Sequence, residues 1–312
     1  MSTHFRHVSE WGQARYSEEL GVNLVQFVNQ AYLNIGAFQN VTIDQSGAYG
    51  GEMSRLRPVD DPRYNEGQVW QAFRKNWVWE DVDYTHSPIY ISGVYINGDF
   101  QPTTGVGDYA FSINYPDGLI VFDNGIDIDS DVEMEYSYKL VSVYDDRSDW
   151  FKNIQYNSQR ADSAHFTQYG SGTYDILSQS RVQLPFVVVS PIADVELRPY
   201  EVGNHHERRQ SVLFHIYAEN TWDRNTITDD LVNQKNAILF TFDYNKVLES
   251  GVYPLNYNGS TNENGLNYSQ LISEGVGYRR RKIEVEDVGA EQLFSDSLPL
   301  RSVVRWQVAG LI

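Results

Sequence analysis

The chain has 312 residues, of which 41% are hydrophobic and 14% aromatic, and it carries 24 Lys and Arg against 42 Asp and Glu. This composition excludes a disordered tail, and the length is sufficient for one large domain or two of ordinary size. The net charge of −18 argues against nucleic-acid binding as the main function, because the chain repels phosphate, although DNA could still slide past it. The absence of cysteine excludes disulfides and thiolate chemistry. No apolar run approaches the ~18 residues of a membrane span and the first residues open no signal peptide, so we expect a soluble protein made in a cytoplasm.

The first predicted element is a helix over residues 9–34. Apolar residues recur at steps of three and four, as on the buried face of a helix. They are Leu20, Leu24, Phe27, Val28, Ala31 and Ile35. Asn34 and Gly36 supply the stop. Such a helix requires a sheet or a partner to cover its apolar stripe.

Residues 41–144 have the pattern of short strands. Residues 89–96 form a β-rich run, and Asn97-Gly98 turns it into Phe100, which is a strong hairpin signal. Further alternating segments lie at 109–115, 119–122 and 134–143. The pattern predicts a compact antiparallel β unit, closed by the polar joint at 145–149.

Residues 158–183 are rich in Ser, Gln, Tyr and Gly and show weak periodicity, which predicts a long loop. A loop of this length is uncommon inside a compact domain unless it binds something. Contact with a neighbouring subunit would explain it.

The remainder is predicted to be an α/β unit. Phe186-Val187-Val188-Val189 is a continuous apolar run, typical of a strand buried on both faces. Residues 194–200 continue or follow it. Residues 211–218 alternate as a strand, with Val212, Phe214, Ile216 and Ala218 on one face.

A helix is predicted next, over residues 223–234, with Asn220 or Thr221 as its cap and Ile227 and Leu231 on its inner face. An Asn- and Gly-rich segment occupies 253–266. The last two strands are predicted at 277–285 and 302–308.

Asp127, Asp129 and Asp131 have the spacing of a calcium-binding loop. The motif then requires Gly where this chain has Val132 and a bidentate Glu where it has Tyr138. We therefore interpret the segment as a turn with solvated carboxylates.

His205-His206-Glu207 has the residue types of a metal or acid–base cluster, but adjacent strand residues point to opposite faces. We interpret residues 203–209 as a polar turn between two strands. The sequence contains no Gly-x-Ser-x-Gly elbow, phosphate-binding loop or dinucleotide fingerprint. We assign no catalytic residue, cofactor site or metal site, and we expect a protein that is not an enzyme.

Trp70, Trp77 and Trp79 could stack on sugar rings, but such residues more often fill a core or an interface, which is the interpretation we favour. Arg279-Arg280-Arg281-Lys282 is a basic run. In a strand, Arg280 and Lys282 would share one face, opposite Arg279 and Arg281. The run could contact passing DNA or pair with acids of a neighbouring subunit, and the acidity of the chain favours the second.

The order of elements in the C-terminal half resembles the phage tail terminator family, whose small α/β subunits form hexameric rings that cap the tail tube. The resemblance covers residues 9–36 and 184–312. It consists of the N-terminal helix, Leu184-Pro185-Phe186-Val187-Val188-Val189 as the first core strand, a polar hairpin, the strand at 212–218, the helix from Asp223, Gly277-Tyr278-Arg279-Arg280, an acidic loop and the strand at 302–308. Neck and head-completion proteins share this order, and the β unit departs from small terminators as an insertion.

The resemblance implies an α+β fold, with a tail-terminator-like α/β core and an inserted antiparallel β domain. In this division, residues 1–39 form the N-terminal helix of the core, 40–150 the inserted β domain, 151–183 a long loop and 184–312 the α/β core.

The implied function is that of a structural virion protein, located in the tail or neck and assembled in the host cytoplasm. It forms a homo-oligomeric ring, expected to be a hexamer, that ends tail-tube growth and joins tail to head. The implied partners are copies of itself, the tail tube protein and neck or connector proteins, with DNA passing through without specific binding and with no membrane contact. The alternatives are a neck or head-completion connector, a carbohydrate-binding tail module and a glycoside hydrolase.

Overall fold

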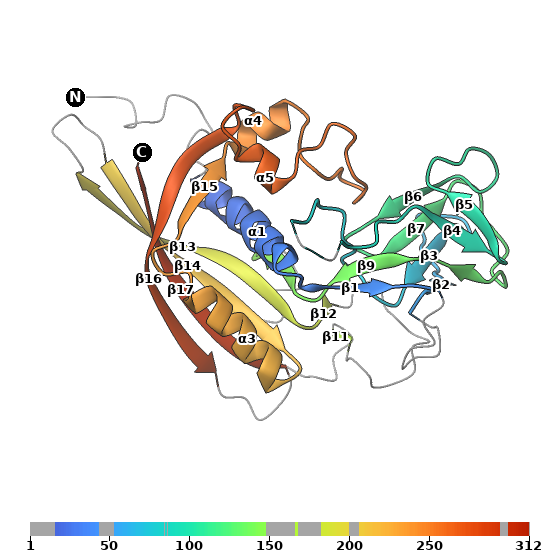
Figure 1. The fold of residues 1–312 in the computed structure, drawn as a ribbon, viewed down its shortest axis with the longest axis horizontal. Helices are drawn as coiled ribbons and strands as arrows, with labels where there is room; N and C mark the ends of the chain where they lie inside the picture. Colours follow the sequence, from blue (N-terminus) through green and yellow to red (C-terminus); the bar gives the residue numbers. More distant parts are fainter. Residues whose placement is uncertain are drawn as a thin grey trace.

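The computed structural model describes residues 16–43, 53–83, 85, 87–147, 166–167, 182–199, 206–293 and 299–311. These residues form a six-stranded sheet covered by helices and, beside it, an antiparallel β unit (Figure 1). The fold belongs to the α+β class, as predicted. No helix among the described residues is both long enough and apolar enough to cross a membrane.

Helix α1 (Tyr16–Asn34) carries the predicted apolar stripe, and Leu20, Leu24 and Val28 of that stripe are buried in the core of the sheet. Val22, on another side of the helix, is buried in a second small core. Gly36 ends the helix with φ of +83°, a left-handed conformation that glycine adopts without strain. Ile35 lies beyond the last turn and is 62% exposed. Residues 9–15 of the predicted helix lie outside the described part.

The core sheet contains β10, β13, β14, β17, β16 and β15 in that order. Their bounds are Ser142–Asp145, Phe186–Pro199, His206–Ala218, Leu300–Leu311, Arg279–Leu293 and Ile238–Phe242. Only the β10–β13 pair is parallel among these neighbours. The prediction for residues 186–189 is confirmed, since all four side chains are fully buried.

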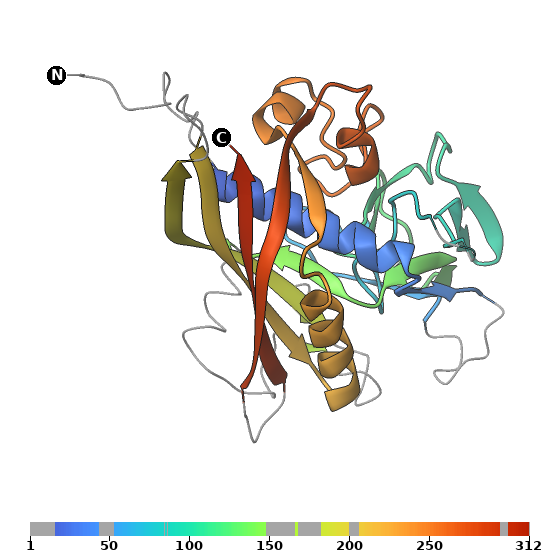
Figure 2. The same cartoon turned by 60° about the vertical axis from the view of Figure 1, so that its left-hand side comes forward.

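Helices α1 and α3 (Thr221–Val232) pack against the same face of this sheet (Figure 2). The core between the layers includes Phe214 and Trp306, whose ring centroids are 4.4 Å apart. The Nε1 atom of Trp306 donates to the Leu231 carbonyl at 2.9 Å, which fixes α3 on the sheet. Asn220 is the N-cap of α3, as predicted, and its side chain accepts from the Asp223 N–H.

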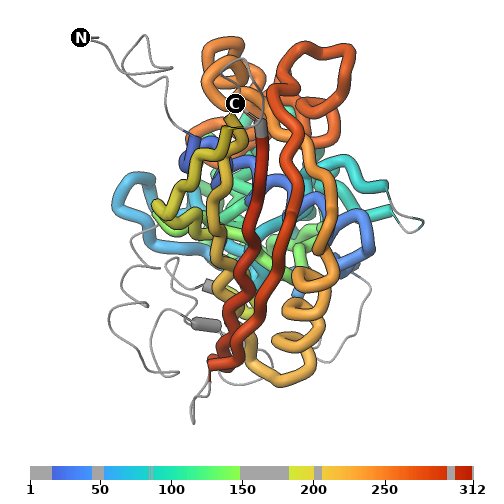
Figure 3. The backbone as a smooth tube through the Cα atoms, turned by 90° about the vertical axis from the view of Figure 1, so that its left-hand side faces the viewer, coloured from blue at the N-terminus to red at the C-terminus, as the bar shows by residue number. Residues whose placement is uncertain are grey.

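The strands of the core are longer than the sequence pattern predicted. Residues 206–209 belong to β14 and are paired with β13, so their interpretation as part of a turn was wrong. Residues 203–205 lie outside the described part. Strand β15 and the short helices α4 (Tyr244–Glu249) and α5 (Tyr268–Leu271) were not predicted, and the helices bury a second small core against Phe242. The long β16 and β17 run side by side across the molecule (Figure 3).

The β unit contains a seven-stranded sheet in the order β5, β4, β8, β2, β3, β7, β6, with every neighbouring pair antiparallel. Strands β1 and β9 form a separate antiparallel pair. The bounds of β1 to β9 are Phe38–Val41, Arg55–Pro58, Val69–Ala72, Gly93–Ile96, Asp99–Pro102, Phe111–Asn114, Leu119–Phe122, Val132–Glu133 and Tyr136–Lys139. Two further short strands, β11 (Phe166–Thr167) and β12 (Val182–Gln183), pair with each other in parallel.

The hairpin predicted at Asn97-Gly98 is present as β4–β5, and the alternating segments predicted at 109–115 and 119–122 pair with each other as β6–β7. Asn97 and Gly98 have φ of +50° and +87°, the two positive angles that a type I′ turn requires. The single strand predicted at 134–143 was wrong. Its residues divide between β9, which stays in the β unit, and β10, which enters the core sheet.

Candidate assembly surfaces

The three aspartates at calcium-loop spacing form a hydrogen-bonded turn. The Asp127 carboxylate accepts from the Asp129 N–H at 3.1 Å, and the Asp131 carboxylate pairs with Arg55 at 3.0 Å. The Asp131 carboxylate is therefore paired with the Arg55 guanidinium of the protein itself. Within the described ranges, no three His, Asp or Glu side chains are placed to hold a metal ion.

Of the His205-His206-Glu207 cluster, the last two residues lie at the start of strand β14, and His205 lies outside the described part. His206 opens β14 opposite Pro199, while Glu207 pairs with Arg209 at 3.0 Å. Arg209 also binds Glu286 of β16 at 2.7 Å. The first ion pair lies within β14, and the second reaches across β17 to join β14 to β16.

Trp70 and Trp77 lie in the core of the β unit, as we predicted for such residues. Their Nε1 atoms donate to the Gly67 and Arg74 carbonyls at 2.8 and 2.7 Å, so the indoles are satisfied internally. Trp79 is half-buried, with the Lys139 ammonium 5.6 Å from its ring. The three rings therefore do not form a solvent-facing platform.

The basic run lies at the start of β16, where the register with β15 shifts between Thr241 and Phe242. This bulge breaks the predicted alternation, because Arg280 and Arg281 both reach helix α1. Arg280 forms an ion pair with Glu19, and Arg281 stacks on Tyr16 with its guanidinium carbon 4.4 Å from the ring centroid. Arg279 pairs with Glu274 at 2.9 Å. Two of these arginines thus pair with acids of the same chain.

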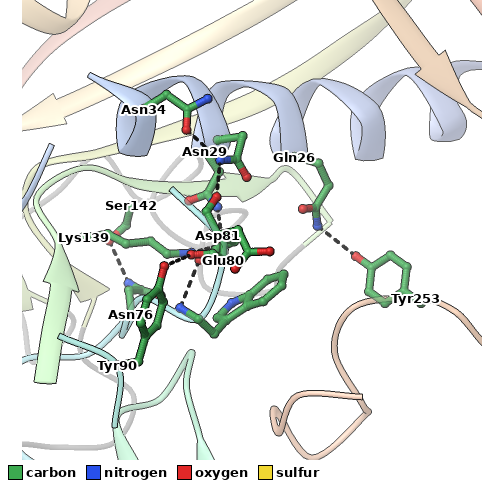
Figure 4. A network of polar contacts seen from close by, with 12 residues as sticks. Gln26, Asn29, Asn34, Asn76, Glu80, Asp81, Tyr90, Lys139, Ser142 and Tyr253 are labelled. Carbon is green, nitrogen blue, oxygen red and sulfur yellow. Dashed lines mark hydrogen bonds and ion pairs between the residues drawn. The ribbon is translucent and has the colours of Figure 1, made fainter. Parts of the chain in front are cut away.

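A buried polar network joins the core to the β unit (Figure 4). Its centre is Glu80, whose side chain is 2% exposed. The Glu80 carboxylate accepts from Asn29 of α1 at 2.6 Å and from Lys139 of β9 at 2.5 Å. The other oxygen accepts from the Trp79 N–H at 3.2 Å. A buried charge of this kind is tolerated because it is paired and hydrogen-bonded.

Amide side chains of α1 extend this network along the helix. Gln30 donates to the Asp81 carbonyl at 2.8 Å, and the Asn34 side chain accepts from the Asp83 N–H at 3.1 Å. Gln26 donates to the Tyr253 hydroxyl at 3.2 Å. We did not assign these residues from the sequence. The signal was present, since Gln26, Asn29, Gln30 and Asn34 recur at helical steps beside the apolar stripe.

The core sheet has open strand edges on both of its sides. Strand β10 pairs with β13 only up to Val189, and among the described residues no strand pairs with the outer edge of residues 191–199. On the other side, β15 pairs with β16 only up to Glu284, which leaves residues 286–293 similarly open within the described part. The two open segments lie toward opposite ends of the sheet, because His206 adjoins the end of β17 and Leu293 adjoins its start.

An apolar patch lies at the end of α1 and the start of α3. Its exposed side chains are Trp222, Ile35 and Leu140, which are 80%, 62% and 42% exposed. The patch borders a groove that also includes Asp223 and the buried Tyr32. The Tyr32 hydroxyl has no hydrogen-bond partner among the described residues, and burial raises its pKa well above the usual value. We call these residues the tryptophan patch.

A pocket lies at the opposite end of α1, under its first turn. Tyr16, Arg208 and Arg281 form its polar side, and its floor is apolar. The floor residues are Leu20, Ile283, Val308 and Ala309. The Tyr16 ring contacts both guanidinium groups, at 4.7 Å for Arg208 and 4.4 Å for Arg281. We call this the arginine pocket.

The arginine pocket has an excess of positive charge. Glu19 also lines it, but Arg280 forms an ion pair with that carboxylate. Within the described part, Arg208 and Arg281 form no ion pair with a carboxylate within 4.0 Å. Burial, together with the like charge of Arg281, lowers the pKa of Arg208. The pocket can therefore accept a negatively charged group.

Comparison with known proteins provides no identification: the sequence matches no protein-family model and no curated protein.

Proposed function

We propose that the chain is a structural, non-catalytic subunit of a phage particle. In this proposal it forms a homo-oligomeric ring at the tail–neck junction, ends growth of the tail tube and joins the tail to the head. The tail-terminator-like order of elements in the core is its starting point.

The observation that carries the proposal is a pair of strand edges on opposite sides of the core sheet, at residues 191–199 and 286–293, that no other described strand covers. Long unpaired edges are sites where other chains add strands. The two edges are unlike and lie on different sides, so pairing between copies is heterologous. Heterologous contacts generate rings when the rotation closes.

The charge of the chain also supports this role. A subunit with 42 acids against 24 bases presents a surface that repels DNA phosphates, so DNA passes along it without sticking. The proposed partners are further copies, the tail tube protein and neck or connector proteins. A neck or head-completion connector is the second candidate, since such a protein requires the same edge-mediated ring.

The experiment is imaging of the purified chain by negative stain and mass photometry, alone and with tail tubes. We expect rings, and density at one end of each tube. A chain that stays monomeric at high concentration and leaves tube ends bare would refute the proposal. A particle map separates the two candidates, because a terminator contacts the last tube ring whereas a connector lies on the head side.

A further inference from the structure

The tryptophan patch and the arginine pocket have opposite properties. Trp222 projects from the first turn of α3 and is more exposed than Ile35 and Leu140, the other two exposed apolar side chains of the patch. Asp223 follows it directly and, within the described part, forms no ion pair with Lys or Arg. The arginine pocket is concave and presents two guanidinium groups above an apolar floor.

We propose that the arginine pocket of one copy receives Trp222 and Asp223 of a second copy. The indole packs on the apolar floor and against the guanidinium groups, while the Asp223 carboxylate faces Arg208 and Arg281. Tryptophan is the best aromatic partner for an arginine cation and is enriched among the residues that dominate interface energies. Ile35 and Leu140 surround the contact and exclude water from it.

The occupant is assigned as a second copy because one chain carries both complementary parts. Among the described residues, Arg208 and Arg281 of the pocket form no ion pair within 4.0 Å. The patch supplies Asp223, whose carboxylate accepts a hydrogen bond from the neutral Asn220 side chain but is not ion-paired within the same residues, beside an exposed aromatic ring. The pocket opens to solvent and holds about 50 Å³ of space, so an indole enters it only in part and otherwise lies across its mouth.

The two surfaces lie at opposite ends of α1, which at 1.5 Å per residue is about 28 Å long. A contact between unlike surfaces is head-to-tail, and it adds copies until a ring closes. The inference thus deepens the proposed function, on which it rests for the existence of a ring, by naming the side chains through which the copies meet.

The first test is Trp222→Ala, a change at an exposed side chain that leaves the fold intact. We expect the concentration for half-assembly, measured by mass photometry, to rise about 30-fold or more, as for a central tryptophan of an interface. The matched control is Tyr257→Ala, which removes another fully exposed aromatic ring and is expected to leave assembly unchanged.

The second test exchanges charges. Asp223→Arg alone and Arg281→Glu alone are each expected to prevent assembly, because each places like charges in contact. An equimolar mixture of the two variants is expected to assemble again through the contact between Arg at 223 and Glu at 281. Asp108→Arg, an exposed reversal in the β unit, is the control for charge alone.

Circular dichroism establishes whether each variant is folded. If a charge variant does not fold, the assembly of Trp222→Ala alone tests the contact. Any of three results overturns this contact. The first is unchanged assembly of Trp222→Ala, the second is a mixture of folded charge variants that does not assemble, and the third is a wild type that is monomeric at every concentration. Rings that survive Trp222→Ala and still cap tail tubes overturn the contact but leave the proposed function standing. Assembly that depends on Trp222 but gives no binding to tail tubes would support the contact and refute the proposed function.

Discussion

Replacing Glu80 by Gln tests whether the buried network holds the β unit to the core. The substitution keeps the shape but removes the charge, so that Lys139, 11% exposed, is left without its carboxylate. Breaking a buried ion pair in this way costs about 3–5 kcal/mol. At about 2.1 cal/mol/K per residue, unfolding of the whole chain as one unit has an entropy of about 0.65 kcal/mol/K, so we expect a fall in Tm of about 5–8 °C.

The assay is calorimetry at fixed protein concentration, because assembly shifts apparent stability. The double variant Glu80→Gln with Lys139→Met removes both charges, and we expect it to be less destabilised than the sum of the single variants by about 1–3 kcal/mol. The control is Lys235 with Asp287, an exposed pair at 3.1 Å whose loss is expected to leave the Tm nearly unchanged, because water screens the two charges. Additive single effects, or a Glu80→Gln protein as stable as the control, would show that the network does not carry the junction.

Three further predictions concern the core. Asn23→Ala removes a buried amide that donates to the Phe242 carbonyl at 3.1 Å and accepts from its N–H at 2.8 Å, so we expect a loss of about 2–4 kcal/mol in urea unfolding. Asn220→Ala removes the cap of α3 and is expected to cost about 1 kcal/mol, whereas Asn220→Gly should cost only a few tenths. Burial lowers the pKa of His215, so the stability that its neutral form provides is full above pH 6.5 and is lost as the pH falls through the folded-state pKa. His215→Gln should therefore reduce the loss of stability between about pH 7 and pH 5, and an unchanged pH profile would contradict this assignment.

The parts of the fold that were predictable are those that local sequence determines. The run at residues 186–189 is apolar throughout because its strand is buried on both faces. The turn at Asn97-Gly98 and the cap at Asn220 follow from side chains that favour one backbone geometry wherever they occur.

The features that the sequence did not reveal depend on partners far along the chain. Strand β10 has the alternating pattern of its neighbour β9, and only its pairing with β13 assigns it to the core sheet. The bulge at Arg280 exists only opposite Thr241 and Phe242. Glu80 has the sequence signature of a surface acid, and it is buried because Asn29 and Lys139 meet it from other elements.

The large separation of α1 and β13 in the chain has a consequence for folding during synthesis. Helix α1 leaves the ribosome well before β13, against which it packs and which follows about 150 residues later, or about 8–30 s at ordinary translation rates. Strands β1 to β9 emerge in between and possess an apolar core of their own. The newly made β unit can therefore fold on its own core before β13 is available to cover the apolar stripe of α1.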